Sequence, residues 1–295
     1  MAGLAENDSI KAENLVWIFG TGRGGSTWLA SMMGELARRR FWDEPLVGKL
    51  FGDLYYSGAG TVQSDWDDFV YARKYRDAWL RSIRNFVLES ASVRFAEVAE
   101  NDYLIVKEPN GSIGAPLIME ALPESRMILL VRDPRDVVAS NLNALGEEGW
   151  LAEQHRSAPR PGGDLARRNP DAAIKRRAKR YVENVRNAKD AFESHEGHKV
   201  LIRYEDLRAD TLGTMKRLYS TLDISVKEED LIRTVESYAW ENIPEEEKGP
   251  GKFNRKATPG GWREDLTPEQ ARIIEESTAL LIEEFYPSRE QGNYG

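Results

Sequence analysis

The feature that most constrains the fold is a glycine-rich segment between a short apolar stretch and an amphipathic one. Residues 15–19 read LVWIF, and GTGRGGSTW follows directly over residues 20–28. From about Gly25 onward, large apolar residues recur at the spacing of one helix face: Trp28, Leu29, Met32, Met33 and Leu36. We therefore expect a buried strand, a tight loop and a helix, which together aim free backbone N–H groups at an anion.

Short apolar stretches alternate with helical ones along the rest of the chain. Strands are expected at 103–107 (YLIVK), 127–131 (MILLV) and 199–204 (KVLIRY), and amphipathic helices at 171–193 and 268–285. This alternation favours a mainly parallel sheet covered by helices, with ligands outside the carboxyl ends of the strands. We expect a flexible N-terminus over residues 1–13 and one three-layer α/β/α domain over residues 14–290.

Loops and one further helical region complete this prediction. The segment 46–64 is rich in glycine and aromatic residues, which favours a loop, and 145–170 is rich in glycine, proline and charge. Residues 65–100 carry apolar positions that indicate a long helical region. Two short helices are expected after the strand at 199–204.

Composition excludes several classes of protein. The 295 residues carry a net charge of −8, which argues against non-specific binding to nucleic acid. No apolar stretch is long enough for a membrane span, and the N-terminus lacks the features of a signal peptide. The sequence has no cysteine, so it offers neither a thiolate nucleophile nor a disulfide framework. A cytoplasmic enzyme is the expectation.

The glycine-rich loop departs from the nucleotide-triphosphate motif G-x-x-x-x-G-K-[ST] at one position. Gly20, Gly25 and Thr27 match it, but Ser26 stands where the lysine belongs. That lysine reaches the β- and γ-phosphates, so its absence disfavours triphosphate chemistry while the amide cradle is kept. Arg23 offers a cation to a single phosphate or sulfate instead.

A second candidate anion site follows the strand at 127–131. Arg132 stands at the strand's end, and Ser140 lies two turns into the next helix. Asp133 and Asp136 have a structural interpretation, in which they cap the helix and pair with the arginines. An acidic residue after an apolar strand also keeps a nucleotide kinase or hydrolase open as an alternative.

Three motifs in this order resemble those of the sulfotransferases that use 3′-phosphoadenylyl sulfate. GRGGSTW resembles the family's 5′-phosphosulfate loop, VRDPRDVVAS its 3′-phosphate motif, and RKATPGGW at 255–262 its RKGxxGxW loop. The resemblance implies a P-loop-like fold and sulfuryl transfer to an acceptor hydroxyl. It also implies 3′-phosphoadenylyl sulfate as co-substrate, adenosine 3′,5′-bisphosphate as product, and no required metal.

The resemblance also assigns the donor-binding residues. The 5′-phosphosulfate would be held by the loop residues Arg23, Gly24, Gly25, Ser26 and Thr27. The adenine would be contacted by Trp28, Tyr204 and Ser237. The 3′-phosphate would be bound by Arg132, Ser140, Arg255 and Lys256. Ala257 replaces a family glycine, so this last loop is expected to approach the phosphate differently.

The catalytic groups follow from the chemistry together with the resemblance. Sulfuryl transfer, like loose phosphoryl transfer, places charge on the leaving oxygen, and a nearby cation stabilises it. Lys107 matches the family lysine that assists the leaving group. Pro109 stands where cytosolic members carry their histidine base, so another base is needed. The three histidines lie outside the motifs and are expected at the surface: His155, His195 and His198.

A carboxylate is the remaining candidate for the base. FWDEPL at 41–46 resembles the FEPL segment of carbohydrate sulfotransferases, which makes Glu44 the first choice. Partial burial would suit that role by raising its pKa. Asp43 and Glu108 are the alternatives.

The acceptor site is expected from residues 46–66, from 145–170 and from the region before Arg255. Four aromatic residues either line it or belong to the core: Phe51, Tyr55, Tyr56 and Trp66. A carbohydrate, a lipid and a small natural product all fit as acceptors. Besides the kinase or hydrolase, an inactive nucleotide-binding module stays open as an alternative.

Overall fold

A computed structural model of the protein describes residues 10–38, 40–59, 68–70, 72–96, 102–145, 169–249, 252 and 256–287. The chain divides into two compact units. The first comprises Met1–Leu130 and Asn184–Ser237, and the second comprises Val131–Glu183 and Tyr238–Gly295. The single domain over residues 14–290 therefore stays a prediction. Of the expected flexible N-terminus, residues 1–9 lie outside the described residues.

A five-stranded sheet runs through the first unit. Its strands are β1 (Leu15–Phe19), β2 (Phe41–Asp43), β3 (Leu104–Lys107), β4 (Arg126–Val131) and β5 (Lys199–Arg203), in the order β2-β3-β1-β4-β5. β1 pairs in parallel with β3 and β4, and β2 pairs in parallel with β3. β1 is buried along its whole length, as expected of a strand covered on both faces. The predicted α/β class with a mainly parallel sheet is confirmed.

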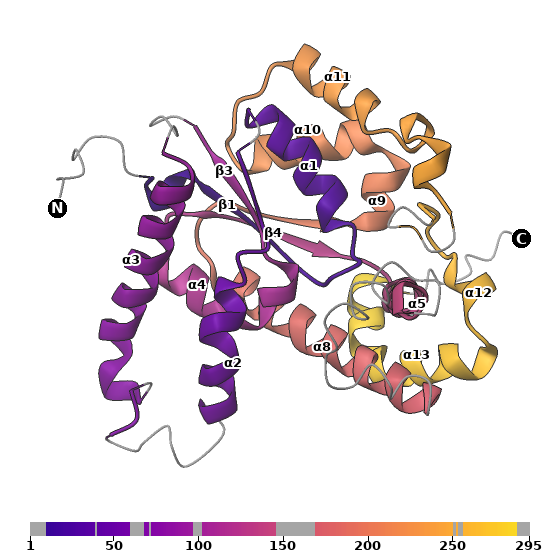
Figure 1. Ribbon diagram of the computed structural model, residues 1–295, viewed down its shortest axis with the longest axis horizontal. Coiled ribbons are helices and arrows are strands. Elements are labelled where there is room, and N and C mark those ends of the chain that lie inside the picture. Colours follow the sequence, from indigo (N-terminus) through magenta and orange to yellow (C-terminus); the bar gives the residue numbers. More distant parts are fainter. Residues whose placement is uncertain are drawn as a thin grey trace, which may run out of the picture. The chain divides into compact units, whose positions relative to one another are not determined.

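Helices cover both faces of this sheet. The first unit contains α1 (Ser26–Leu36), α2 (Val47–Ala59), α3 (Arg76–Arg94), α4 (Ala115–Ala121), α9 (Tyr204–Ala209), α10 (Thr211–Thr221) and α11 (Glu228–Ser237). In Figure 1, α1, α10 and α11 lie on one side of the sheet, and α3 and α4 lie on the other. Three helices, rather than the expected two, follow β5. Short 3₁₀ helices are η1 (Ala12–Asn14), η3 (Arg73–Tyr75) and η4 (Pro109–Gly114).

The second unit is helical and has its own apolar cluster. It holds α5 (Pro134–Leu145), most of the long α8 (Pro170–Ser194), α12 (Trp262–Asp265) and α13 (Pro268–Phe285), with η5 (Trp240–Asn242) and η6 (Glu245–Glu247). Val138 of α5 packs with Ile174 of α8 and Ile274 of α13, and all three side chains are fully buried. The helices predicted at 171–193 and 268–285 are thus confirmed.

The prediction of a loop over residues 46–64 is wrong for Val47–Ala59, which form α2. Its glycines allow close packing rather than chain flexibility. A Cβ atom on Gly48 would lie 2.0 Å from the carbonyl oxygen of Gly111, and one on Gly52 would lie 2.7 Å from Cα of Gly114. The first turns of α2 therefore pack backbone to backbone on η4, which only glycine permits.

Two further expectations need adjustment. Among the described residues of the helical region predicted for 65–100, helix is found in η3 and α3, where Trp79, Ile83 and Val87 are buried as the pattern indicates. His195, expected at the surface, is only 4% exposed, and this burial lowers its pKa. Of the predicted loop at 145–170, residues 146–168 lie outside the described residues. Within the described residues, no helix is long and apolar enough to cross a membrane.

Candidate active site

The glycine-rich loop joins the carboxyl end of β1 to the N-terminus of α1. Arg23 and Gly25 both have backbone conformations in the left-handed region, with φ of 70° and 94°. A Cβ atom on Gly25 would lie 2.4 Å from the ring of Tyr204, so no other residue fits there. Gly25 is the N-cap of α1, and the free N–H groups and positive end of that helix favour a bound anion.

Lys107 lies at the centre of the polar groups beside this loop. Its Nζ donates a hydrogen bond to Oγ1 of Thr27 at 3.1 Å and forms an ion pair with Oε1 of Glu44 at 3.2 Å. A second ion pair joins it to Oδ1 of Asp43 at 2.5 Å. Parallel strands end at the same edge of a sheet, which explains why β3 and β2 bring these groups together. The residue is 5% exposed, so this cation is little screened by water.

Glu44 is held on both of its carboxylate oxygens. Oε2 accepts a hydrogen bond from Nδ2 of Asn110 at 2.6 Å, while Oε1 faces Lys107. The backbone N–H of Glu44 also donates to the carbonyl oxygen of Lys107 at 2.9 Å. The Glu44 side chain is 29% exposed, compared with 59% for Asp43. Glu44 thus combines a fixed orientation with access to a ligand.

Glu108 points away from solvent, although it directly follows Lys107. It is 0% exposed, and its carboxylate accepts hydrogen bonds from the N–H groups of Leu46 (2.9 Å) and Gly48 (3.3 Å). These are free amides at the start of α2, so Glu108 caps that helix. The pKa of Glu108 is raised to about 8, chiefly by burial and also by the nearby charge of Glu44, while the two amide donors and Lys107 partly oppose this rise.

The residues predicted to contact adenine also belong to the first unit. Trp28 and Tyr204 are in edge-to-face contact, with ring centroids 6.2 Å apart, and the guanidinium of Arg208 lies 5.5 Å from the Trp28 ring centroid. Tyr204 is buried at 5% exposure. Ser237 ends α11, where its hydroxyl donates to the carbonyl oxygen of Thr234 at 2.9 Å.

The residues predicted to bind the 3′-phosphate belong to the second unit. Arg132 directly follows β4 and is 8% exposed, and Tyr181 donates from its hydroxyl to the Arg132 carbonyl oxygen at 2.8 Å. Ser140 lies on α5 and is also 8% exposed. Lys256 forms ion pairs with Glu264 and Asp265. Arg255 lies outside the described residues.

Asp136 ties the C-terminal motif to α5. Its two carboxylate oxygens accept hydrogen bonds from the N–H groups of Gly260 (2.7 Å) and Trp262 (2.9 Å). The Trp262 ring contacts two guanidinium groups, with its centroid 4.4 Å from that of Arg135 and 4.5 Å from that of Arg263.

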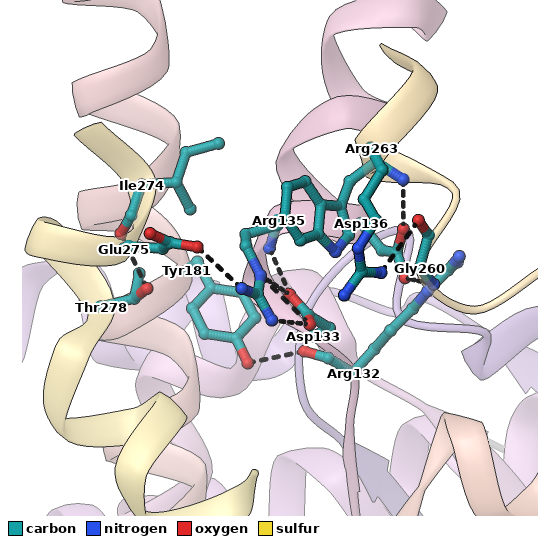
Figure 2. Close-up of polar contacts among 11 residues, drawn as sticks. Arg132, Asp133, Arg135, Asp136, Tyr181, Gly260, Arg263, Ile274, Glu275 and Thr278 are labelled. Atoms are coloured by element: carbon teal, nitrogen blue, oxygen red, sulfur yellow. Dashed lines mark hydrogen bonds and ion pairs between the residues drawn. The ribbon is translucent and has the colours of Figure 1, made fainter. Parts of the chain in front are cut away.

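A second set of contacts holds Arg135 at the start of α5. Figure 2 shows its guanidinium in contact with Asp133 and with Glu275 of α13. The structural interpretation of Asp133 thus holds, whereas Asp136 binds backbone N–H groups.

Sequence reasoning missed two contributors to these arrangements. Asn110 belongs to none of the motifs, yet it orients Glu44; its signal is a polar residue shortly after the carboxyl end of a buried strand. Asp136 was treated as a helix cap, yet it binds a loop more than 120 residues later in the sequence.

A parallel sheet with a glycine loop after β1 and basic residues after β3 and β4 defines an α/β protein of the phosphate-loop type. The family model described as "Sulfotransferase family" matches residues 16–228. The chain belongs to the sulfotransferase family.

Solved structures of sulfotransferases share its fold. Mouse sulfotransferase SULT7A1, crystallised with PAP, is 13% identical with a TM-score of 0.54, over 94% of this chain and 86% of that one. Sulfotransferase STF9 from Mycobacterium avium is 14% identical with a TM-score of 0.57, over 94% of this chain and 78% of that one. No curated protein matches the sequence.

Proposed function

We propose that the protein transfers a sulfuryl group from 3′-phosphoadenylyl sulfate to the hydroxyl group of an acceptor, with Lys107 and Glu44 as its catalytic residues. The observation that carries this proposal is the position of the Lys107 ammonium, which contacts Thr27 of the loop on one side and Glu44 on the other. One cation thus lies between the donor's anion cradle and a carboxylate able to accept a proton.

The donor fits the residues that are present. The amides of Gly25 and Ser26 at the start of α1 suit the 5′-phosphosulfate, and Arg23 supplies a cation from the loop itself. The N–H group of Gly24 donates instead to the carbonyl oxygen of Thr21 at 3.1 Å. Trp28 and Tyr204 offer aromatic surface for the adenine, beside Ser237. Arg132, Ser140, Arg255 and Lys256 are proposed for the 3′-phosphate on the strength of the motifs.

The proposed step is an in-line displacement at sulfur. The acceptor oxygen forms a bond to sulfur while its proton passes to the carboxylate of Glu44. The bond between sulfur and the bridging phosphate oxygen breaks, and the electron pair stays on that oxygen. Lys107 and Arg23 stabilise the charge that develops there, and adenosine 3′,5′-bisphosphate leaves.

Geometry favours Glu44 over the two other candidate bases. Both oxygens of Glu108 are directed at the amides of α2, and its side chain has no access to solvent. Asp43 is open to solvent and is held by Lys107, whereas Glu44 has a second fixed donor in Asn110. A base that is oriented on two sides fits a reaction that needs a defined approach of the acceptor.

The acceptor has an apolar part that lies along α2. Leu50 and Leu54 are 58% and 53% exposed and lie one helix turn apart on α2, and Leu46, 41% exposed, directly precedes that helix. This leucine row of Leu46, Leu50 and Leu54 begins two residues after Glu44, and its two helical members are roughly 6 Å apart along the axis, at about 1.5 Å per residue. An aliphatic alcohol with its hydroxyl at Glu44 would cover these side chains.

The aromatic residues expected to line the acceptor site contact other parts of the first unit. Phe51 packs edge-to-face on Phe86 of α3, and Tyr55 contacts Trp79 of the same helix. Tyr56 packs against Tyr55, and Trp66 lies outside the described residues. The leucine row, rather than these rings, supports an apolar acceptor.

The test is transfer of labelled sulfate from the donor to a set of alcohols, with 1-decanol and glucose as the extreme members. We expect turnover of decanol to be at least tenfold faster. Replacing Leu50 and Leu54 together by serine should raise the KM for decanol at least tenfold, because partial burial of two leucines is lost. Leu280→Ser, a change at a leucine of α13 that is 66% exposed, should alter this KM less than twofold. Glucose turnover without decanol turnover would refute the apolar acceptor.

The same assay tests the base and the alternatives. Glu44→Gln should lower turnover at least a hundredfold and leave the Kd for adenosine 3′,5′-bisphosphate nearly unchanged, since the carboxylate acts only on the acceptor. Wild-type turnover in this variant would exclude Glu44. Bisphosphate binding without any sulfated product would indicate an inactive binding module. Magnesium-dependent hydrolysis of ATP or GTP would indicate a nucleotide hydrolase.

A further inference from the structure

We infer that Glu108 is a positioning residue for Glu44: its buried carboxyl group holds the Glu44–Leu46 turn that aims the base. This inference rests on the proposed function of Glu44. Glu108 lies outside the three donor motifs. Its role comes from the contacts of its side chain, none of which faces the donor loop.

The turn that carries Glu44 is strained. Glu44 and Leu46 have φ of 47° and 59°, in the left-handed region that residues with a Cβ atom seldom adopt. Pro45 between them lacks an N–H group and cannot contribute a backbone hydrogen bond as donor. Such conformations persist only where surrounding contacts enforce them. The turn therefore needs an external restraint.

The side chain of Glu108 supplies that restraint through two hydrogen bonds to the backbone. Its Oε2 accepts the N–H of Leu46 at 2.9 Å, and its Oε1 accepts that of Gly48 at 3.3 Å. Glu108 is itself anchored to the sheet, since its N–H donates to the carbonyl oxygen of Ile18 at 2.9 Å. A single side chain thus links the strained turn and the start of α2 to the sheet.

The surrounding backbone leaves room for this carboxylate. A Cβ atom on Gly111 would lie 1.7 Å from Oε1 of Glu108, so only glycine is compatible with the buried side chain. The preceding residue, Asn110, donates to Oε2 of Glu44. Glu44 is therefore held in two ways: Glu108 restrains the backbone of its turn, and Asn110 of η4 orients its carboxylate.

Glu108→Gln and Glu108→Ala test the inference. Glutamine keeps one acceptor oxygen but presents an NH₂ group to the other amide, and alanine removes both acceptors. Turnover of decanol per folded molecule should fall at least tenfold in the first and further in the second, with less than a twofold change in the Kd for the bisphosphate. Asp210→Ala, which removes the cap that accepts the Gly213 N–H on α10, is the control for lost helix capping.

Two readouts separate positioning from a purely structural role. In a Glu44→Gln background, Glu108→Gln should cause less than a twofold further loss, because the group it positions is gone. Amide exchange in residues 44–50, which needs no acceptor, should become at least tenfold faster in Glu108→Ala and stay unchanged in Asp210→Ala.

The outcomes also distinguish this inference from the proposed function. If Glu44→Gln is inactive while Glu108→Gln keeps its turnover, Glu44 is the base and Glu108 does not position it. If exchange in residues 44–50 accelerates but Glu44→Gln keeps its turnover, the restraint is real and the proposed base is wrong. Unchanged exchange in Glu108→Ala overturns the inference regardless of activity.

Discussion

The ammonium group of Lys107 lies 3.2 Å from Oε1 of Glu44, at the edge of the sheet where β2 and β3 end. In the proposed reaction, Lys107 is the cation beside the leaving group and Glu44 is the base beside the acceptor, so the two roles fall on side chains in direct contact. Because Lys107 is almost fully buried, water screens its charge little.

Replacing Lys107 by methionine should therefore slow the chemical step. Loss of one electrostatic contact to a developing charge lowers turnover by about a hundredfold to a thousandfold in comparable sites. Single-turnover measurements with saturating donor isolate this step. Lys216→Met is the charge-matched control: Lys216 forms a solvent-exposed ion pair with Glu228, so this variant should turn over like the wild type. A loss confined to the KM for the acceptor would contradict the role of Lys107.

Although the short strand β2, which brings Glu44 beside Lys107, is not among the expected strands, the place of Lys107 at a strand end could be predicted from the sequence. The direction of the Glu108 side chain could not. Glu108 directly follows Lys107 in sequence, but whether its side chain faces the ligand or the interior depends on α2. Its carboxyl oxygens accept hydrogen bonds from the N–H groups of Leu46 and Gly48 at the start of that helix.

The helix α2 itself escaped prediction for a related reason. Gly48 and Gly52 weaken a helix locally, and their benefit appears only in the contact with η4. Local propensity carries no information on so close an approach. Likewise, the link from Asp136 to Gly260 joins distant parts of the sequence, and no periodicity signals it.

Glu108 should make the stability of the protein depend on pH. Burial raises its pKa from 4.5 to about 8, with Glu44 raising and Lys107 lowering it, so the folded protein binds this proton more tightly than the unfolded chain. Its stabilising contribution is then complete below the unfolded pKa and is lost as the pH rises through the folded one. The loss amounts to a few kcal/mol between about pH 5 and pH 9, at about 1.4 kcal/mol per pKa unit.

Urea unfolding across this range measures the effect. The difference in free energy of unfolding between the wild type and Glu108→Gln should shrink as the pH rises, since glutamine does not titrate. A difference that is independent of pH would show that Glu108 titrates normally in the folded protein.

Gly48→Ala tests the close packing of α2 on η4. In an exposed helix this substitution stabilises by about 1 kcal/mol, because alanine is the better helix former. Here the added Cβ atom would lie 2.0 Å from the carbonyl oxygen of Gly111, so we expect destabilisation by at least about 2 kcal/mol. Turnover should fall as well, because the contact borders Glu108. Thermal unfolding measures the first effect, and a raised Tm would contradict the packing.

Asp136→Ala should weaken binding of adenosine 3′,5′-bisphosphate. Asp136 is 3% exposed and accepts the N–H groups of Gly260 and Trp262, so its removal leaves two amides without their acceptor, at a cost of about 1–3 kcal/mol each. The released loop carries Lys256, which is proposed for the 3′-phosphate. Calorimetric titration should give a Kd at least tenfold higher, whereas adenosine 5′-phosphate, which lacks the 3′-phosphate, should bind as to the wild type. Equal weakening for both nucleotides would mean that Asp136 supports the fold of the second unit and not the orientation of this loop.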